Sequence, residues 1–313
     1  MIDWLLVARD NGYGLTGDSA ILTKAIEEAG RTSSNTGVRA RGLVEWLVRR
    51  KRAKRILHVE RAFPRWFSAG KENWLIPNQE RFPRRHLGRL KHIDHVLAKT
   101  RHAEAIFAPL AGKVSYLGFT SEDRLVGSVA KDWNRFFHLA GGSTLKGTED
   151  VLALWRDHPE WPELVLVQKA DNAPSQVPSN VRLISGFLDD AGLKTLQNQC
   201  GIHLCPSRAE GWGHNILEAM SVGAVVLTTD APPMNEHVTA DCGVLVTSGR
   251  MVPRHLGTCY HVDIQALERA ILAVIAMPPA EKQRLGRAAQ TRFHDIDAAF
   301  RRRAREIFGA GSG

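Results

Sequence analysis

The chain has 313 residues, of which 43% are hydrophobic and 24% charged; this is typical of a folded globular protein and excludes a disordered or fibrous one. No run of about 18 apolar residues occurs and no basic segment opens the chain, so we predict neither a membrane-spanning helix nor a signal peptide. The four cysteines form no Cys-x-x-Cys pair, which favours reduced, mostly buried thiols and a cytoplasmic protein, with attachment to a membrane surface left open.

The first part of the chain begins with a predicted strand at residues 4–8, a glycine-containing loop at 11–17 and a helix at 18–29. The glycines of this loop, Gly12 among them, could simply form a turn. His58 ends a later predicted strand and is a candidate for a ligand-facing residue. A histidine with a purely structural role is the alternative there.

The positive charge is concentrated in the first part of the chain. Residues 1–137 hold 25 Lys and Arg against 14 Asp and Glu, a net of +11, whereas the remaining residues hold 17 against 19, a net of −2. The basic residues include the run 49–52 and the candidates Arg81, Arg84 and Arg85, with aromatic residues interleaved. Such a surface suits a polyanion, either an anionic membrane or nucleic acid. A solvated basic helix with core aromatics is the alternative for any single residue.

The second part of the chain has the pattern of parallel strands and helices. Strands are predicted at residues 135–140, 164–167, 180–187, 202–205 and 224–228, with intervening helices. The sequence GGSTLKG follows the strand at 135–140, and a helix begins near Thr148. We therefore expect two α/β domains at residues 1–134 and 135–295, followed by a helix at 296–313.

The most informative stretch is residues 203–236. The strand at 202–205 is followed by the loop PSRAEGWG and by a helix that starts near Asn215 and contains Leu217-Glu218-Ala219-Met220. The glycines lie at the carboxyl end of a parallel strand, where backbone N–H groups at a helix N-terminus bind phosphates. The carboxylates Glu210 and Glu218 flank this turn. Taken singly, each has a simpler explanation, since Glu210 could be a solvated loop residue and Glu218 could stabilise its helix N-terminus.

The stretch resembles the donor-binding signature of retaining glycosyltransferases of the GT-B fold, family 4 type, also called glycosyl transferases group 1. The positions that match in register are Pro206, Ser207, Glu210, Gly211, Trp212, Gly213, Leu217, Glu218, Ala219, Met220, Gly223 and Val225. The segment GGSTLKG resembles the phosphate loop of the same family. The resemblance spans about 110 residues, and a dozen matches within one motif is a specific signal.

The resemblance implies two Rossmann-like domains that face each other across a cleft, with the acceptor on the side of residues 1–134 and a nucleotide-sugar donor bound by residues 135–295. It implies that the last helix can cross back to the first domain. Glu210 and Lys146 are the implied catalytic residues, and Glu218 the implied ligand of the ribose. The other implied donor-binding residues are Gly12, Gly142, Ser143, Gly211, Trp212, Gly213, His214, Asn215 and Ile216. His58, Arg81, Arg84 and Arg85 are the candidates on the acceptor side.

The phosphate loop departs from the family pattern at one position. Lys146 and Gly147 match, but Gly142 or Ser143 stands where the family has an arginine. Either Lys146 with backbone N–H groups suffices, or an arginine from elsewhere substitutes. The sequence contains no Asp-x-Asp after a strand and no histidines at metal-ligand spacing, so we expect no metal ion and no other cofactor.

The expected reaction is transfer of a sugar, of hexosyltransferase type, from a nucleotide-diphosphate sugar to an acceptor hydroxyl with retention of configuration. We expect a polyanionic acceptor or a glycan of the membrane or envelope. Sugar transfer to a hydroxylated base in DNA is the alternative within the class. A nucleotide-sugar epimerase and a non-catalytic binding protein are the alternatives from other classes. The sequence does not indicate the oligomeric state, the sugar or a protein partner.

Overall fold

The computed structural model describes residues 1–9 and 14–310, and it divides into two compact units. Unit 1 comprises Met1–Thr120, Pro253–Thr258 and Ile296–Gly313, and unit 2 comprises Ser121–Val252 and Cys259–Asp295. The division falls at Thr120, ahead of the expected residue 134. The reason is that the connecting segment is bonded into unit 2, where the backbone N–H of Arg124 donates to the Ser221 hydroxyl at 3.0 Å.

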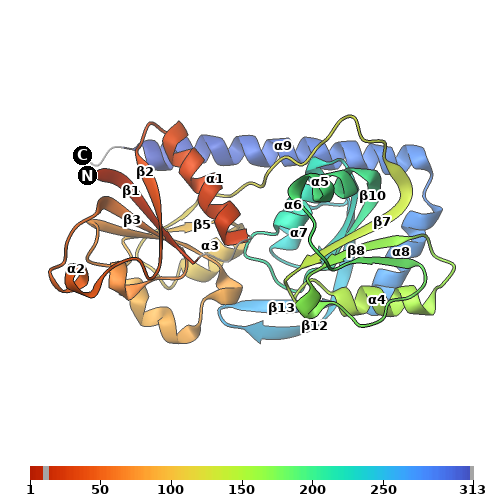
Figure 1. Ribbon diagram of the computed structural model, residues 1–313, viewed down its shortest axis with the longest axis horizontal. Coiled ribbons are helices and arrows are strands. Elements are labelled where there is room, and N and C mark those ends of the chain that lie inside the picture. Colours follow the sequence, from red (N-terminus) through yellow and green to blue (C-terminus); the bar gives the residue numbers. More distant parts are fainter. Residues whose placement is uncertain (10–13, 311–313) are drawn as a thin grey trace. The chain divides into compact units, whose positions relative to one another are not determined.

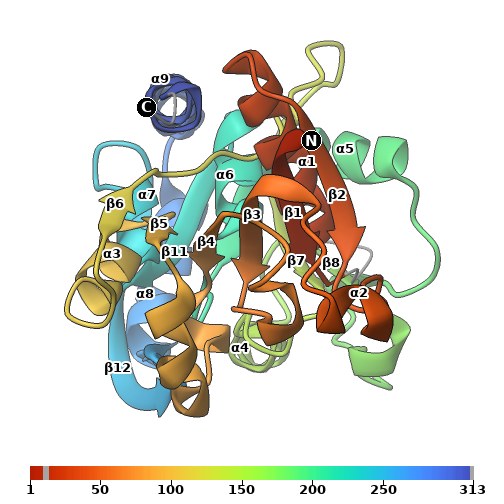
Figure 2. The ribbon, with the colours of Figure 1, turned by 90° about the vertical axis from the view of Figure 1, so that its left-hand side faces the viewer.

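Unit 1 is built on a six-stranded sheet in the order β2-β1-β3-β4-β5-β6, and every neighbouring pair is parallel (Figures 1 and 2). Its strands are β1 (Ile2–Ala8), β2 (Ser33–Gly37), β3 (Ala53–Glu60), β4 (Glu72–Pro77), β5 (His95–Ala98) and β6 (Val114–Tyr116). Its helices are α1 (Gly14–Glu28), α2 (Leu43–Leu47), α3 (Arg101–Phe107) and the 3₁₀ turns η1 (Pro64–Trp66), η2 (Gln79–Arg81) and η3 (Arg84–His92).

Alternation along β1 places two apolar layers on the two faces of this sheet. Leu5 and Val7 pack with Trp66 in one buried cluster. Trp4 points the other way, and its ring meets those of Trp74 and Phe308 edge-on, at centroid distances of 5.0 and 5.2 Å. Phe308 belongs to α9 (Pro279–Gly309), whose residues from Ile296 onward are part of unit 1.

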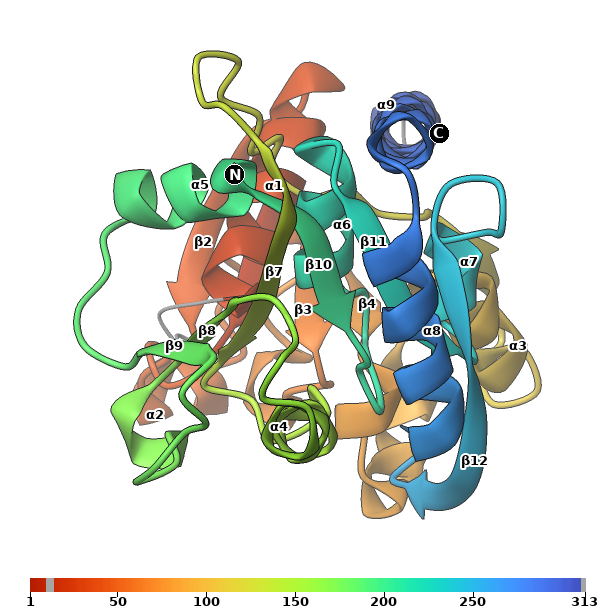
Figure 3. The ribbon, with the colours of Figure 1, turned by 90° about the vertical axis from the view of Figure 1, so that its right-hand side faces the viewer.

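Unit 2 is built on a seven-stranded sheet in the order β13-β12-β11-β10-β7-β8-β9, parallel from β12 to β9 (Figure 3). Its strands are β7 (Asp132–Gly141), β8 (Leu164–Gln168), β9 (Val181–Ile184), β10 (Cys200–Cys205), β11 (Val225–Asp230), β12 (Val244–Arg254) and β13 (Gly257–Val262). Its helices are α4 (Thr148–Asp157), η4 (Ala170–Asn172), α5 (Asp190–Gln199), α6 (His214–Ser221), α7 (Met234–His237), α8 (Ile264–Ala276) and the first part of α9.

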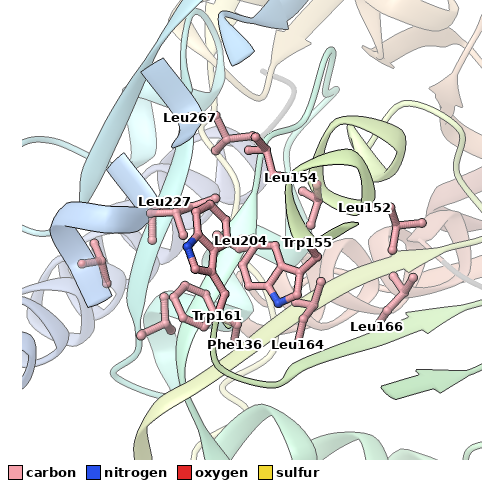
Figure 4. Close-up of a cluster of buried hydrophobic side chains, with 14 of the residues drawn as sticks. Phe136, Leu152, Leu154, Trp155, Trp161, Leu164, Leu166, Leu204, Leu227 and Leu267 are labelled. Carbon is pink, nitrogen blue, oxygen red and sulfur yellow. The ribbon is translucent and has the colours of Figure 1, made fainter. Parts of the chain in front are cut away.

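The main core of unit 2 lies between one face of this sheet and the helices α4 and α8 (Figures 3 and 4). Trp155 of α4 meets Phe136 of β7 and Trp161 edge-on, at centroid distances of 5.1 and 5.0 Å. On the opposite face, Leu196 of α5 packs with Phe137. Because successive strand residues face opposite sides, Phe136 and Phe137 serve the two layers. Each unit is thus a Rossmann-like α/β structure with a parallel sheet, and the predicted fold class is confirmed.

Side-chain caps explain where several helices begin. The carboxylate of Asp189 accepts the backbone N–H of Gly192 at 2.7 Å at the start of α5, and Asp263 accepts that of Ala266 at 2.7 Å at the start of α8. Asp190, next in the chain, pairs with Arg124 at 2.6 Å. Both aspartates of the acidic doublet at 189–190 therefore have a structural role.

Within residues 1–9 and 14–310, no helix is both long and apolar enough to cross a membrane. All four cysteines are free and buried. Burial raises the pKa of the Cys200 and Cys205 thiols to about 12, so these two sulfurs are held as neutral thiols at ordinary pH.

Four buried histidines predict a loss of stability in mild acid. Burial lowers the pKa of His58, His138 and His237 to about 4 and that of His203 to about 3, against an ordinary value of 6.5. The unfolded chain therefore binds more protons than the folded chain below pH 6.5, so stability falls as the pH drops from about 6.5 towards 4. Each pKa unit corresponds to about 1.4 kcal/mol.

Thermal unfolding midpoints measured between pH 7 and pH 5 test this expectation. The change His237→Gln keeps a side-chain donor for the carbonyl of Trp212 and should flatten the profile. The exposed His294, changed to Gln, is the control and should leave the profile unaltered. A midpoint that does not fall over this range contradicts the assignment of neutral buried imidazoles.

Candidate functional site

The loop after β10 is held in place by the neighbouring strand β11. Ser207 is fully buried in this loop, and its carbonyl oxygen accepts a hydrogen bond from the Thr229 hydroxyl at 2.8 Å. The Thr228 hydroxyl donates to the carbonyl oxygen of Cys205 at 2.8 Å. The loop is therefore fixed at the carboxyl end of adjacent parallel strands, which is where open α/β sheets bind ligands.

The loop after β7 lies directly against the loop after β10. Gly147 has a φ of 71°, in the left-handed region, and a Cβ at this position would lie 2.5 Å from the carbonyl oxygen of Pro206. Both conditions require glycine. The backbone N–H of Arg208 also donates to the carbonyl oxygen of Leu145 at 2.8 Å. The two glycine-containing loops predicted from the sequence thus belong to one site.

Lys146 is the centre of this site. Its ammonium group donates to Oε1 of Glu210 at 2.6 Å and to Oδ1 of Asn215 at 2.7 Å. Lys146 and Glu210 are both mostly buried, with side chains 15% and 12% exposed. Asn215 is the second residue of α6, so the lysine lies beside the positive end of a helix. A cation and a helix N-terminus at one place favour an anionic ligand, and Glu210 is the counter-ion in this structure.

Glu218, one turn further along α6, is held by a chain of hydrogen bonds that no sequence pattern indicated. The amide Nε2 of Gln197 donates to Oε2 of Glu218 at 2.9 Å, and Oε1 of Gln197 accepts from Nε of Arg124 at 2.9 Å. Gln197 is 1% exposed and Arg124 is 4% exposed. Since the arginine can only donate, it determines which end of the glutamine amide faces the carboxylate.

The start of α6 is shaped by buried packing. Gly213 caps the helix with a φ of 104°. Trp212 is 4% exposed, and its ring lies edge-on to that of His237 with 4.3 Å between the ring centroids. Its Nε1 donates a hydrogen bond to the Ser121 hydroxyl at 3.2 Å. The same hydroxyl lies 2.8 Å from Nδ1 of His214.

The indole of Trp212 therefore positions the loop from inside the protein rather than presenting a face to a ligand. Ile216 is likewise fully buried. The side chains of these two predicted donor-binding residues therefore pack inside unit 2 and fix the shape of the loop. Gly211, Gly213 and Asn215 are buried as well, whereas His214 is half-buried. Gly12 lies outside the described residues.

The structure offers two candidates for the positive charge missing from the phosphate loop. The alkyl chain of Lys169, which follows β8, runs along Gly142, where a Cβ would lie 3.2 Å from Lys169 Cδ. Its backbone N–H donates to the carbonyl oxygen of Gly141 at 2.9 Å. Any side chain at position 142 would displace this lysine. Ser143 is turned back into its own loop, where its hydroxyl accepts the N–H of Leu145 at 3.1 Å.

Arg208 is the second candidate, and it stands inside the sequence motif as the third residue of PSRAEGWG. Its guanidinium lies 2.9 Å from a carboxylate oxygen of Asp150 and 3.1 Å from one of Glu149, both in the first turn of α4. Two acidic partners neutralise this arginine, so it braces the loop against α4. An arginine in a loop motif was the signal available for this position, but its partners could not be read from the sequence.

His58 does not lie at a surface. It is fully buried, the backbone N–H of Phe63 donates to its Nδ1 at 3.3 Å, and its Nε2 lies 3.2 Å from Oδ1 of Asn73. Both ring nitrogens are satisfied within unit 1. The candidate acceptor-side role is therefore corrected to a structural one. His138 is similar, with Nδ1 at 2.8 Å from the carbonyl oxygen of Leu204 and Nε2 at 3.0 Å from the Thr148 hydroxyl.

Arginines from several loops of unit 1 gather around two histidines. Burial, together with the charges of nearby arginines, lowers the pKa of His86 to about 4. Burial and arginine charges lower the pKa of His255 in the same way. The arginine cluster that surrounds these two histidines consists of Arg9, Arg61, Arg81, Arg85, Arg89 and Arg254. Arg61 and Arg85 act on both histidines. Arg84 is exposed on η3 but is not among the arginines that act on either.

Among the residues that the structure describes, no three His, Cys, Asp or Glu side chains are grouped so that they could hold a metal ion. The charged groups gathered at the site of unit 2 are Lys146, Glu210 and Glu218. They suit the binding of an anionic, hydroxyl-rich ligand by ionic and hydrogen bonds.

Comparison with solved structures identifies the fold as GT-B. A glycosyltransferase from Rickettsia africae ESF-5 superposes with a TM-score of 0.74 at 13% identity, covering 98% of this chain and 97% of that one. HepE of Anabaena, solved in complex with UDP and glucose, gives 0.72 at 15% identity and covers 98% and 99%. A sucrose-phosphate synthase from Thermosynechococcus elongatus gives 0.71 at 14% identity and covers 96% of each chain.

A family model also matches part of the sequence. Residues 176–292 match the model of the family described as glycosyl transferases group 1. This stretch contains the motif loop, Glu210 and Glu218. The resemblance noted in the sequence is therefore confirmed for this part of the chain, which is similar to glycosyl transferases group 1. The sequence matches no curated protein.

Proposed function

We propose that this protein is a retaining hexosyltransferase of family 4 type that transfers a sugar from a nucleotide-diphosphate sugar to an acceptor hydroxyl without a metal ion. The observation that carries the proposal is that Lys146 Nζ lies 2.6 Å from Glu210 Oε1 and 2.7 Å from Asn215 Oδ1, at the start of α6. Among proteins of the same fold, HepE is described with UDP-glucose, and a pneumococcal transferase with UDP and GlcNAc. These ligands support a nucleotide-sugar donor.

The residues have distinct roles in this proposal. Lys146 and the N–H groups of α6 bind the diphosphate, and they stabilise the negative charge that grows on it as the glycosidic bond breaks. Glu218 accepts hydrogen bonds from the ribose hydroxyls, and Glu210 accepts hydrogen bonds from hydroxyls of the transferred sugar. Lys169 supplies the second positive charge that the phosphate loop lacks at Gly142 and Ser143. The departing phosphate accepts the acceptor's proton, so the reaction requires no strong general base.

The donor half of the proposal is tested by incubating the protein with a panel of nucleotide sugars and measuring released nucleotide, with and without candidate acceptors. We expect slow release with one donor and faster release when the correct acceptor is added. Turnover of the sugar nucleotide into an isomer, with no nucleotide released, would identify an epimerase instead. Binding without turnover of any donor would identify a non-catalytic binding protein.

The acceptor half rests on the arginine cluster. Six arginines around the buried His86 and the exposed His255 form a concentrated positive charge in unit 1. Such a surface favours a polyanionic acceptor, and we take a glycan of the envelope or membrane as the first candidate. A hydroxylated base in DNA is the second candidate, since it also presents phosphates next to the reacting group.

Duplex DNA serves as a polyanion probe for this cluster. The double change Arg81→Ser and Arg85→Ser should weaken DNA binding at low salt and should lower the slope of log affinity against log salt by about 0.9 for each phosphate that is no longer neutralised. The exposed Arg156 of α4, changed to Ser, is the control and should have no effect. Affinity that persists at physiological salt favours the DNA alternative. No binding even at low salt contradicts a polyanionic acceptor.

A further inference from the structure

The helix α2 and the residue that follows it expose a group of large apolar side chains. Leu43 is 57% exposed, Val44 71%, Trp46 41%, Leu47 64% and Val48 67%. We call these five residues the α2 patch. Seven other large apolar residues among the described ones are exposed, and no two of them are adjacent in the sequence. A contiguous exposed apolar group of this kind marks an interaction surface.

The α2 patch is held rigidly, although α2 is only one turn and a half long. Arg41 is fully buried beneath it, and its guanidinium donates to the carbonyl oxygens of Arg65, of Glu45 at 3.3 Å and of Arg50 at 3.2 Å. The guanidinium also lies 5.9 Å from the ring centroid of Trp66 in the core. One buried cation thus ties α2 and the segment that follows it to η1. The exposure of the patch is a property of the folded unit and not of a frayed loop.

The surroundings of the patch are strongly basic. Residues 39–55 contain seven Lys and Arg besides the buried Arg41, and a single acidic residue, Glu45. Glu45 is paired with Arg50 at 3.4 Å and with Arg52. The exposed basic residues here are Arg39, Arg49, Arg50, Lys51, Arg52 and Lys54. The basic run at residues 49–52 therefore borders an apolar surface that no sequence pattern indicated.

We propose that the α2 patch is a docking surface for an anionic lipid bilayer. Leucine and valine side chains would enter the boundary of the acyl chains, Trp46 would lie at the level of the headgroups, and the basic residues would contact lipid phosphates. Nucleic acid explains the arginines and lysines but offers no partner for five apolar side chains. A second copy of the chain would cover the apolar surface but would bring two clusters of like charge together, which is unfavourable.

This inference deepens the proposed function because it names the surface at which an envelope or membrane acceptor would be met. It is independent of the donor chemistry, since no residue of the α2 patch belongs to the site around Lys146. A glycosyltransferase attached in this way would act on acceptors confined to the bilayer surface, where two-dimensional confinement raises their local concentration.

The test is cosedimentation of the whole chain with vesicles of phosphatidylcholine alone and with vesicles of phosphatidylcholine and phosphatidylglycerol in equal parts. The triple change Leu43→Ser, Val44→Ser and Leu47→Ser removes the apolar component, and the double change Arg49→Ser and Arg50→Ser removes charge. Leu110→Ser, at another exposed leucine of unit 1, is the matched control.

We expect the wild type to bind the anionic vesicles and to lose binding as salt is raised. At every salt concentration, the affinity of the triple variant for the anionic vesicles should be lower by about tenfold or by an even larger factor. The double variant should lose mainly the salt-sensitive part of its binding to anionic vesicles. The control should bind as the wild type does. Because the substituted positions are exposed, thermal unfolding midpoints should not change.

The proposal is overturned if the wild type binds neither kind of vesicle at low salt, or if the triple variant binds as strongly as the wild type. It is also overturned if the patch mediates self-association, seen as a dimer in sedimentation velocity that the triple change abolishes. Release of nucleotide from the donor in the absence of vesicles should be equal in all variants. A lack of that release in the wild type would contradict the proposed reaction and leave the result with vesicles intact.

Discussion

Replacement of Lys146 by alanine should lower the rate of sugar transfer about 10²- to 10³-fold, the range found when one group that stabilises transition-state charge is removed. The nucleotide is a better leaving group when a positive charge lies against its phosphates. That charge counts most when the bond to the sugar has partly broken. Nucleotide affinity should therefore fall much less than turnover. Initial rates at saturating donor, together with calorimetric affinities for the free nucleotide, measure the two effects separately.

Three further variants sharpen the experiment. Lys146→Arg keeps the charge and should retain more activity than the alanine variant. Lys169→Ala should lower turnover as well if this lysine supplies the second positive charge beside Gly142. Glu210→Gln removes the counter-ion at 2.6 Å from Lys146, and it should impair positioning of the sugar while sparing affinity for the free nucleotide. Wild-type rates in both Lys146→Ala and Glu210→Gln at saturating donor would contradict the assigned site.

Replacement of Glu218 by alanine should weaken nucleotide binding about 10- to 150-fold, which corresponds to roughly 1.5–3 kcal/mol for charge-assisted hydrogen bonds to the ribose. The fold should persist, because Glu218 is half-buried on the surface of α6 and its carboxylate accepts from the neutral amide of Gln197. Isothermal titration with a series of nucleotides checks the effect. A ribose ligand should matter equally for nucleotides that differ only in the base.

Gln197 provides a test that depends on the structure and not on the motif. The change Gln197→Glu places a second carboxylate within hydrogen-bond distance of Glu218, where like charges repel, so Glu218 should turn or take up a proton. Nucleotide affinity should fall and should recover partly at lower pH. Glu268→Ala, which removes a carboxylate of α8 paired with His158, is the control. Unchanged affinity in both Glu218→Ala and Gln197→Glu would exclude the ribose-binding role.

Local sequence predicted the glycine turns of the loop after β10 and the α/β type of each unit. Short-range rules suffice for this, because apolar runs predict buried parallel strands and glycine at a strand end predicts a tight turn into a helix. Gly147 and Gly213 are found in left-handed conformations, as such turns require. The motif from Pro206 to Met220 is also local, so its family could be recognised without knowing what it packs against.

Tertiary structure alone decided which residues meet. Lys146 and Glu210 are 64 positions apart, and they form a contact only because β7 and β10 are neighbours in the sheet. The same reason applies to Gln197 beside Glu218 and to Lys169 beside Gly142. No local pattern encodes these pairs, because strand order is set by the packing of the whole unit.

Burial was the other property that the sequence could not decide. His58 looked available at a strand end, yet it lies fully enclosed with both nitrogens bonded. Leu43 and Leu47 are apolar residues of a kind that is usually buried in the core, yet they are exposed. An apolar side chain becomes buried only if another element covers it, and whether one does depends on the arrangement of the sheet and its connections. For this protein, the local sequence therefore specifies the residues and turns of the loop after β10, and the packing of each unit decides which side chains meet there.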